Sequence, residues 1–72
     1  MLYTIQNENE PFHHTPTFRG RLLAMYALVN ARMELPPGAD NYALYIADDL
    51  GRPIDTHGLS LRQWARGTDE ED

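Results

Sequence analysis

The chain has 72 residues, no cysteine and a formal net charge of −5. This length fits one small domain with a marginal core, because so short a chain buries only about 60% of its unfolded surface. Without cysteine, disulfides and thiolate metal sites are excluded. There is no run of about 18 apolar residues and no basic-then-apolar leader, so we expect a cytoplasmic protein with no membrane partner.

The negative charge is concentrated at the C-terminal end. Residues 69–72 carry four of the eleven acids, which leaves seven acids against six bases elsewhere, a balance of −1. We therefore expect a single domain over residues 1–67 and a flexible acidic tail over residues 68–72. A nucleic-acid partner is not expected, because the arginines are dispersed and the acidic tail would repel phosphate.

The first half of the chain predicts a strand and then a long helix. Residues 2–6 are a β-prone run. The helix is expected to start near Pro16, with Thr15 or Thr17 as its cap, and to end at Leu35 before two prolines. Its large apolar residues recur at three- and four-residue spacing and form the face with which it would cover a sheet. These residues are Phe18, Leu22, Met25, Val29 and Met33, with Tyr26 at the edge.

Residues 41–48 and 52–57 predict two further strands joined by a tight turn. Asp48 opens this turn and Gly51 takes its left-handed position, and both are residue types that a type I turn with a bulge prefers. The stretch is rich in aspartate, but it lacks the ligand spacing of an EF-hand loop. We therefore interpret it as a hairpin rather than as a metal or catalytic loop.

The end of the chain predicts a short helix over residues 61–66. Ser60 and Gln63 have the spacing of a capping box, and Gly67 is expected to supply a left-handed stop. The order β-α-β-β-α predicts a compact α+β domain in which the long helix packs on one face of a three-stranded mixed sheet. The first two strands of that sheet would be parallel.

The histidines raise the alternative of a small metal- or histidine-dependent enzyme. His57 and Asp55 would share a face of their strand, and His13 and His14 could join them. No motif spacing supports a zinc site, and a base without an activated nucleophile is half a site. We therefore predict no catalytic residue, no metal and no cofactor, with this enzyme as the alternative function.

The long helix also carries a stripe of small residues on the side opposite its large apolar face. Three interpretations stay open: alanines that fill exposed positions, a seat for the C-terminal helix through Trp64, or a surface for a protein partner. The marginal size of the domain favours a partner, either a second copy or a foreign protein. The predicted interface comprises Arg19, Gly20, Leu23, Ala24, Ala27, Leu28 and Ala31.

The charges of this helix oppose its dipole. Arg19 and Arg21 are near the positive N-terminal end, and Glu34 is near the negative C-terminal end. Departures from local rules are expected at functional sites. We therefore predict a non-enzymatic protein-binding module. By class, small acidic proteins without cysteine are often accessory or inhibitor proteins of phages and other bacterial mobile elements, which dock on a host protein.

Overall fold

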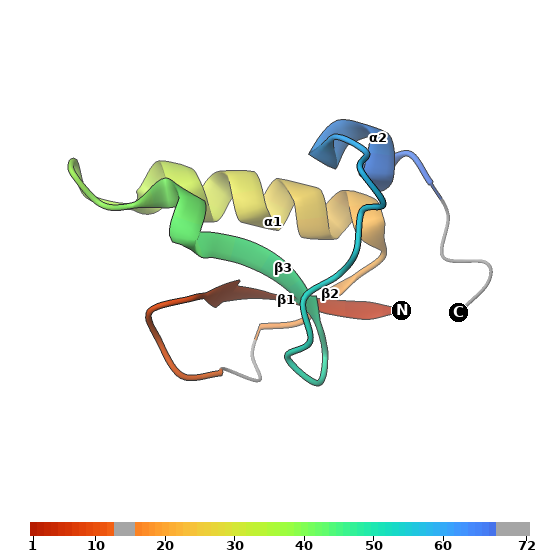
Figure 1. Ribbon diagram of the computed structural model, residues 1–72, viewed down its shortest axis with the longest axis horizontal. Coiled ribbons are helices and arrows are strands. Elements are labelled where there is room, and N and C mark those ends of the chain that lie inside the picture. The colour runs from red at the N-terminus through yellow and green to blue at the C-terminus, as the bar shows by residue number, and fades with distance from the viewer. Residues whose placement is uncertain (13–15, 68–72) are drawn as a thin grey trace.

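The computed structural model describes residues 1–12 and 16–67, without the side chain of Asn41. It confirms the predicted α+β class, with a three-stranded sheet, a long helix and a short C-terminal helix (Figure 1). No helix in this part of the chain has the length and apolarity needed to span a membrane. The elements are β1 (Leu2–Asn7), β2 (Phe18–Arg19), α1 (Arg21–Glu34), the 3-10 turn η1 (Asn41–Ala43), β3 (Leu44–Asp48) and α2 (Leu61–Ala65).

The sheet is antiparallel throughout, with the strand order β2-β1-β3. β1 pairs with β3 from Tyr3 opposite Asp48 to Asn7 opposite Leu44. The prediction of a mixed sheet with a parallel first pair is therefore wrong. The reason is the short strand β2, which runs antiparallel to β1 and precedes α1 (Figure 1). After α1, the chain returns to the sheet as β3, which is also antiparallel to β1.

α1 begins later than predicted because residues 18 and 19 belong to β2. Its N-cap is Gly20, at φ 86° and ψ 157°, a backbone conformation that is essentially restricted to glycine. The helix has no side-chain cap, so the prediction of a cap at Thr17 is wrong, and Thr15 lies outside the described residues. The helix ends before the extended Leu35, as predicted from the prolines that follow.

The predicted turn after β3 is confirmed, but the strand over residues 52–57 is not. The amide of Gly51 donates to the carbonyl of Asp48 at 3.1 Å, and Gly51 has a φ of 85°. Beyond the turn, Pro53 forms an isolated bridge to Ala47. Two backbone bonds flank this bridge: the amide of Asp48 donates to the carbonyl of Arg52 at 2.9 Å, and the amide of Ile54 donates to the carbonyl of Ile46 at 3.2 Å. The nitrogen of Pro53 takes part in neither bond, so proline is tolerated at this position of the edge.

The capping box of α2 is confirmed. The hydroxyl of Ser60 accepts from the amide of Gln63 at 3.2 Å, and the side-chain oxygen of Gln63 accepts from the amide of Ser60 at 3.1 Å. The predicted left-handed stop at Gly67 is wrong, because Gly67 is not at positive φ. Its amide instead donates to the carbonyl of Trp64 at 3.1 Å, which satisfies one of the last carbonyls of the helix.

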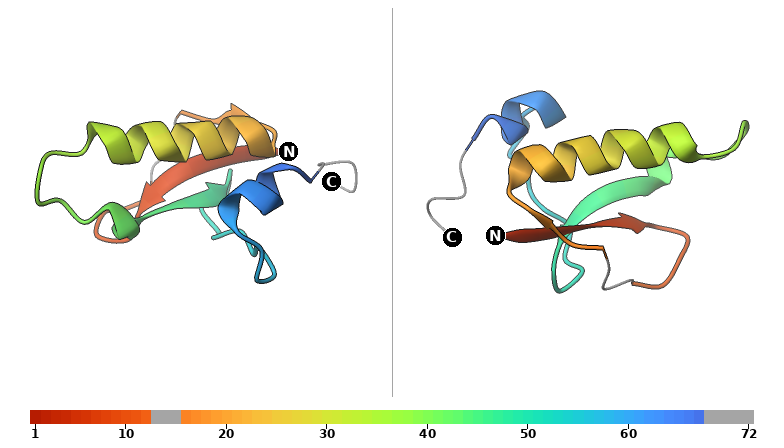
Figure 2. Two further views of the ribbon diagram at one scale, coloured as in Figure 1. Left: turned by 90° about the horizontal axis from the view of Figure 1, so that it is seen from above. Right: turned by 180° about the vertical axis from the view of Figure 1, so that it is seen from behind.

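The core lies between α1, one face of the sheet, and α2, which sits beside the first half of α1 (Figure 2). The ring of Trp64 stands edge-on to Tyr3, with 5.4 Å between centroids. The guanidinium of Arg21 lies 5.3 Å from the Trp64 ring and donates to the Trp64 carbonyl at 3.2 Å. The central residues are Tyr3, Ala24, Leu28, Leu44, Ile46, Trp64 and Ala65.

Candidate protein interface on helix α1

α1 turns its small residues toward the sheet, which is the reverse of the predicted orientation except for Met25, which packs against the core as predicted. Ala24 is 0% exposed, Leu28 is buried, and both belong to the same core cluster as Trp64. Small side chains suit this face because Trp64 and the strand residues already fill the volume beneath the helix. The prediction that Ala24 and Leu28 form an accessible interface is therefore wrong, since this part of the stripe packs with Trp64.

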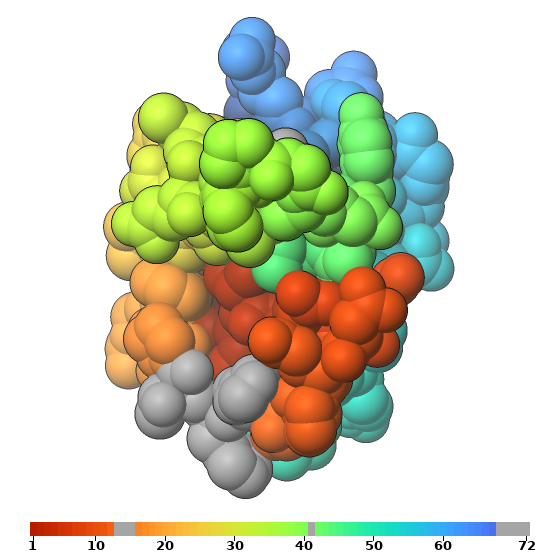
Figure 3. All heavy atoms as spheres, turned by 90° about the vertical axis from the view of Figure 1, so that its left-hand side faces the viewer, coloured from red at the N-terminus to blue at the C-terminus, as the bar shows by residue number. Residues whose placement is uncertain are grey.

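The other residues of the predicted interface have different places. Gly20 serves as the helix N-cap. Ala27 and Ala31 are half-buried and line a hollow of about 420 Å³ between α1 and β1, on the side that Figure 3 shows. Arg19 and Leu23 are exposed. Of the predicted set, these last two residues remain fully accessible to a partner.

A second, exposed stripe of large apolar residues runs along the side of α1 that faces away from the sheet. The exposed fraction ranges from 40% for Val29 to 76% for Met33. Large apolar patches of this kind on soluble proteins mark interaction sites. The prediction that Leu22, Val29 and Met33 cover the sheet is therefore wrong. We call these residues the outer stripe: Leu22, Leu23, Tyr26, Val29 and Met33.

Four members of the outer stripe lie on one line along the helix. Leu22, Tyr26, Val29 and Met33 are separated by four, three and four residues. At about 100° per residue they fall within about 60° of one another around the helix axis. This alternation is the one found at the a and d positions of coiled coils, where one helix packs along another. The sequence displays this spacing, but only the fold shows that these side chains face solvent.

Charged residues lie near both ends of the outer stripe: Arg19 at its N-terminal end, and Arg32 and Glu34 in the last turn of α1, where Glu34 lines the hollow between α1 and β1. Arg19 precedes α1 and Glu34 is its last residue, and both are exposed. Neither forms an ion pair or a side-chain hydrogen bond with another residue that the structure describes. Arg21 differs, because its guanidinium is bound to Trp64. Arg19 and Glu34 are therefore available to a partner.

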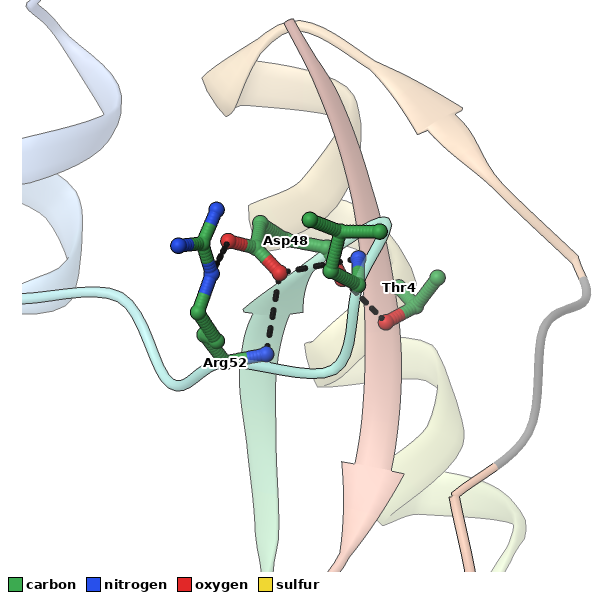
Figure 4. A network of polar contacts seen from close by, with 4 residues as sticks. Thr4, Asp48 and Arg52 are labelled. Atoms are coloured by element: carbon green, nitrogen blue, oxygen red, sulfur yellow. Dashed lines mark hydrogen bonds and ion pairs between the residues drawn. The ribbon is translucent and has the colours of Figure 1, made fainter.

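The aspartate-rich stretch after β3 builds a turn (Figure 4). One carboxylate oxygen of Asp48 accepts from the amides of Leu50 and Arg52, both at 2.9 Å. The other oxygen accepts from Nε of Arg52 at 2.9 Å. The main-chain carbonyl of Asp48 also accepts from the hydroxyl of Thr4 at 3.1 Å. The side chain of Asp48 therefore closes the turn, and its backbone ties the turn to β1.

These contacts set the acid strength of Asp48. Burial by itself would raise the pKa of this carboxyl, but the amides of Arg52 and Leu50 and the Arg52 guanidinium together outweigh it. The pKa of Asp48 is therefore lowered from its ordinary value of 3.8. A lowered pKa in the folded state means that the stabilisation is present above the unfolded value and is lost as pH falls through the folded value.

We expect Asp48→Asn to lower the free energy of unfolding by about 1–3 kcal/mol at neutral pH, because the charge-assisted bonds are lost. The difference between wild type and variant should shrink as the pH falls below about 4, where Asp48 of the unfolded chain becomes protonated, and should be lost once the pH also passes the lowered pKa of the folded carboxyl. Urea unfolding, followed by circular dichroism across this pH range, measures both quantities. A difference that does not change with pH would contradict this role of the carboxylate.

The described residues do not assemble the histidines into an active centre. Nδ1 of His57 lies 3.5 Å from Oδ2 of Asp55, but 81% and 75% of these side chains are exposed. Residues 1–12 and 16–67 contain no group of three or more potential ligand side chains that could hold a metal ion. His13 and His14 lie outside these residues. An imidazole so exposed is not shielded from water, so this arrangement does not favour the enzyme alternative.

A further hollow, of about 550 Å³, lies between α1, β3 and residues 53–56. Its walls are mostly apolar, and its charged lining residues are Glu8 and Arg32. These two side chains do not form the nucleophile and base pair that covalent catalysis needs.

Comparisons with protein-family models, with curated proteins and with solved structures gave no match. No relative therefore supplies an activity or a partner for this chain. Among the features that the structure describes, the outer stripe of α1 is the one that best supports a functional proposal.

Proposed function

We propose that the chain is a small non-enzymatic protein-binding module that docks through the outer stripe of α1. One observation carries this proposal: large apolar side chains lie exposed on one side of a helix whose other side already fills the core. Burying one Leu, Val or Met side chain is worth about 1.5–3 kcal/mol. The side chains of the stripe are 40–76% exposed, so a partner that covers them would gain a fraction of this amount from each.

The finer proposal concerns the biological class. Small size, acidity and the absence of cysteine are typical of accessory or inhibitor proteins of phages and other mobile elements, which act in the cytoplasm on a host protein. Such a protein needs a docking surface and no catalytic centre, which is what the outer stripe would provide. A foreign partner and a second copy of the chain would bind to the same stripe. Experiments can distinguish which of the two partners binds.

The double substitution Tyr26→Glu with Met33→Lys should abolish association and leave the fold intact. Both side chains are more than half exposed, and surface substitutions usually change stability by no more than about 0.5 kcal/mol. Both new residues are good helix formers, but their charges would be costly inside an interface. Tyr42→Glu is the matched control, because Tyr42 is 88% exposed and lies outside α1.

Two measurements test this prediction: solution mass by light scattering, and capture of proteins from an extract of the native cells. The wild type and the Tyr42→Glu control should associate in the same way, and the double variant should not. Circular dichroism should show the same helix content in all three proteins. If the double variant is folded and associates as well as the wild type, the outer stripe is not the docking surface.

A further inference from the structure

We infer that the outer stripe is covered by a second copy of this chain, with the two α1 helices packed antiparallel about a two-fold axis. The inference rests on the proposed function, because it names a partner for the same stripe. A two-fold interface places one surface against itself, so the stripe must be complementary to its own reversed copy. Four of the apolar residues and the exposed charges of Arg19 and Glu34 meet this requirement.

Four of the five residues of the stripe match when one helix is reversed, and Leu23 would lie level with Arg32 of the other copy. Leu22 and Met33 are equally far from the midpoint between residues 27 and 28, and Tyr26 and Val29 are equally close to it. Reversal therefore sets Leu22 of one copy against Met33 of the other, and Tyr26 against Val29. Their spacing is that of a and d positions, which interlock when two helices cross at about 20°. One contact would thus cover all four side chains in both copies.

The charges at the ends of the stripe favour the same orientation. In a single chain, Arg19 adds to the positive N-terminal end of the α1 dipole and the exposed Glu34 adds to its negative end, which the half-buried Arg32 of the last turn partly offsets. An antiparallel pair brings the Arg19 end of each copy to the Glu34 end of the other. A parallel pair would instead place like charges and like dipole ends together. A placement that is unfavourable in one chain therefore becomes favourable in the antiparallel pair.

The rest of the chain is compatible with this pairing. Outside residues 69–72, seven acids face six bases, so no large net charge of the body opposes association. Gly67, the last described residue, lies beside Arg21 at the N-terminal end of α1. The two copies of Gly67 would therefore lie at opposite ends of the pair. Oligomerisation is also a common way for a chain of this size to bury more apolar surface.

The absence of native cysteine permits a disulfide test of the geometry. We expect an oxidised mixture of the Leu22→Cys and Met33→Cys variants to form a covalent dimer, and neither variant alone to do so. The two copies of residue 22 would lie about 16 Å apart along the axis, whereas a disulfide needs Cα atoms within about 7 Å. Mixing Met33→Cys with Tyr42→Cys controls for random collisions, and the products are separated on a non-reducing gel.

Charge reversal separates a second copy from a foreign partner. Arg19→Glu or Glu34→Arg alone should weaken the dimer roughly 3- to 30-fold in Kd, because two symmetry-related contacts change in each case. The double variant, Arg19→Glu with Glu34→Arg, should recover the wild-type Kd, since the two ends merely exchange sign. A foreign partner keeps its own charges and would not bind the double variant better. Light scattering over a concentration series gives these Kd values.

The wild type should reach twice its chain mass of 8.3 kDa in solution. The inference is overturned if the wild type remains a monomer at about millimolar concentration, where even a weak dimer would form, and the two cysteine variants form no mixed disulfide. Covalent homodimers of each cysteine variant would also overturn it, because they indicate parallel helices. If the chain is a monomer but Tyr26→Glu with Met33→Lys still abolishes capture of another protein, the proposed function stands with a foreign partner. If neither self-association nor capture depends on the stripe, both proposals fail.

Discussion

Trp64→Ala should lower the free energy of unfolding by about 3–5 kcal/mol, the range for removing a large buried aromatic side chain. Trp64 is buried, stands edge-on to Tyr3 and lies under the guanidinium of Arg21. It is also the residue through which α2 enters the core. A chain of this length is stable by only about 4–11 kcal/mol, so this single change should remove a large fraction of its stability.

Urea unfolding followed by far-ultraviolet circular dichroism measures this loss. The measurement belongs at a single low protein concentration, because self-association would make the apparent stability depend on concentration. Tyr42→Ala is the matched control: it also removes an aromatic ring, but Tyr42 is exposed, so we expect a change within about 0.5 kcal/mol. If Trp64→Ala unfolds as cooperatively and at the same urea concentration as the control, Trp64 is not a central core residue.

The elements that the sequence predicts correctly depend on contacts within a few residues. The capping box at Ser60 joins groups three residues apart, and the turn at Asp48 closes within four. The end of α1 follows from the proline after Leu35. Each of these signals is local, so the rest of the fold does not have to be known to interpret it.

The elements that the sequence misses depend on distant partners. β2 has two residues, and its strand character comes from pairing with β1, which is separated from it by a long loop. The spacing of Phe18 with the apolar residues of α1 instead suggests a longer helix. The strand expected after Asp48 has β-prone residues, but its pairing with β3 is limited to one bridge, between Ala47 and Pro53.

The candidate site is the clearest case of this limit. The sequence displays two faces of α1, one of large and one of small side chains, and size alone suggests that the large residues are buried. The structure buries Ala24 and Leu28 because they pack in the core with Trp64, which lies forty residues after Ala24 in the sequence. The residues and the spacing of the outer stripe are thus visible in the sequence. Its exposure depends on where α2 docks, which no local signal specifies.

Ala24→Leu tests this orientation of α1. Ala24 is 0% exposed and packs in the core with Trp64, so the larger side chain should overpack the core and lower the free energy of unfolding by about 1–3 kcal/mol. Leu and Ala have similar helix propensities. The same substitution at Ala27, which borders a hollow of about 420 Å³, should therefore change stability by no more than about 0.5 kcal/mol.

Leu22→Ala completes the comparison. With the outer stripe exposed, this variant should differ from the wild type by no more than about 0.5 kcal/mol in the monomer. If α1 instead turned its large residues inward, Leu22→Ala would cost about 2–5 kcal/mol, and both alanine positions would accept leucine freely. Urea unfolding of the three variants at low concentration therefore distinguishes the two orientations. The second pattern would place the outer stripe in the core and remove the surface through which we propose that this protein binds its partner.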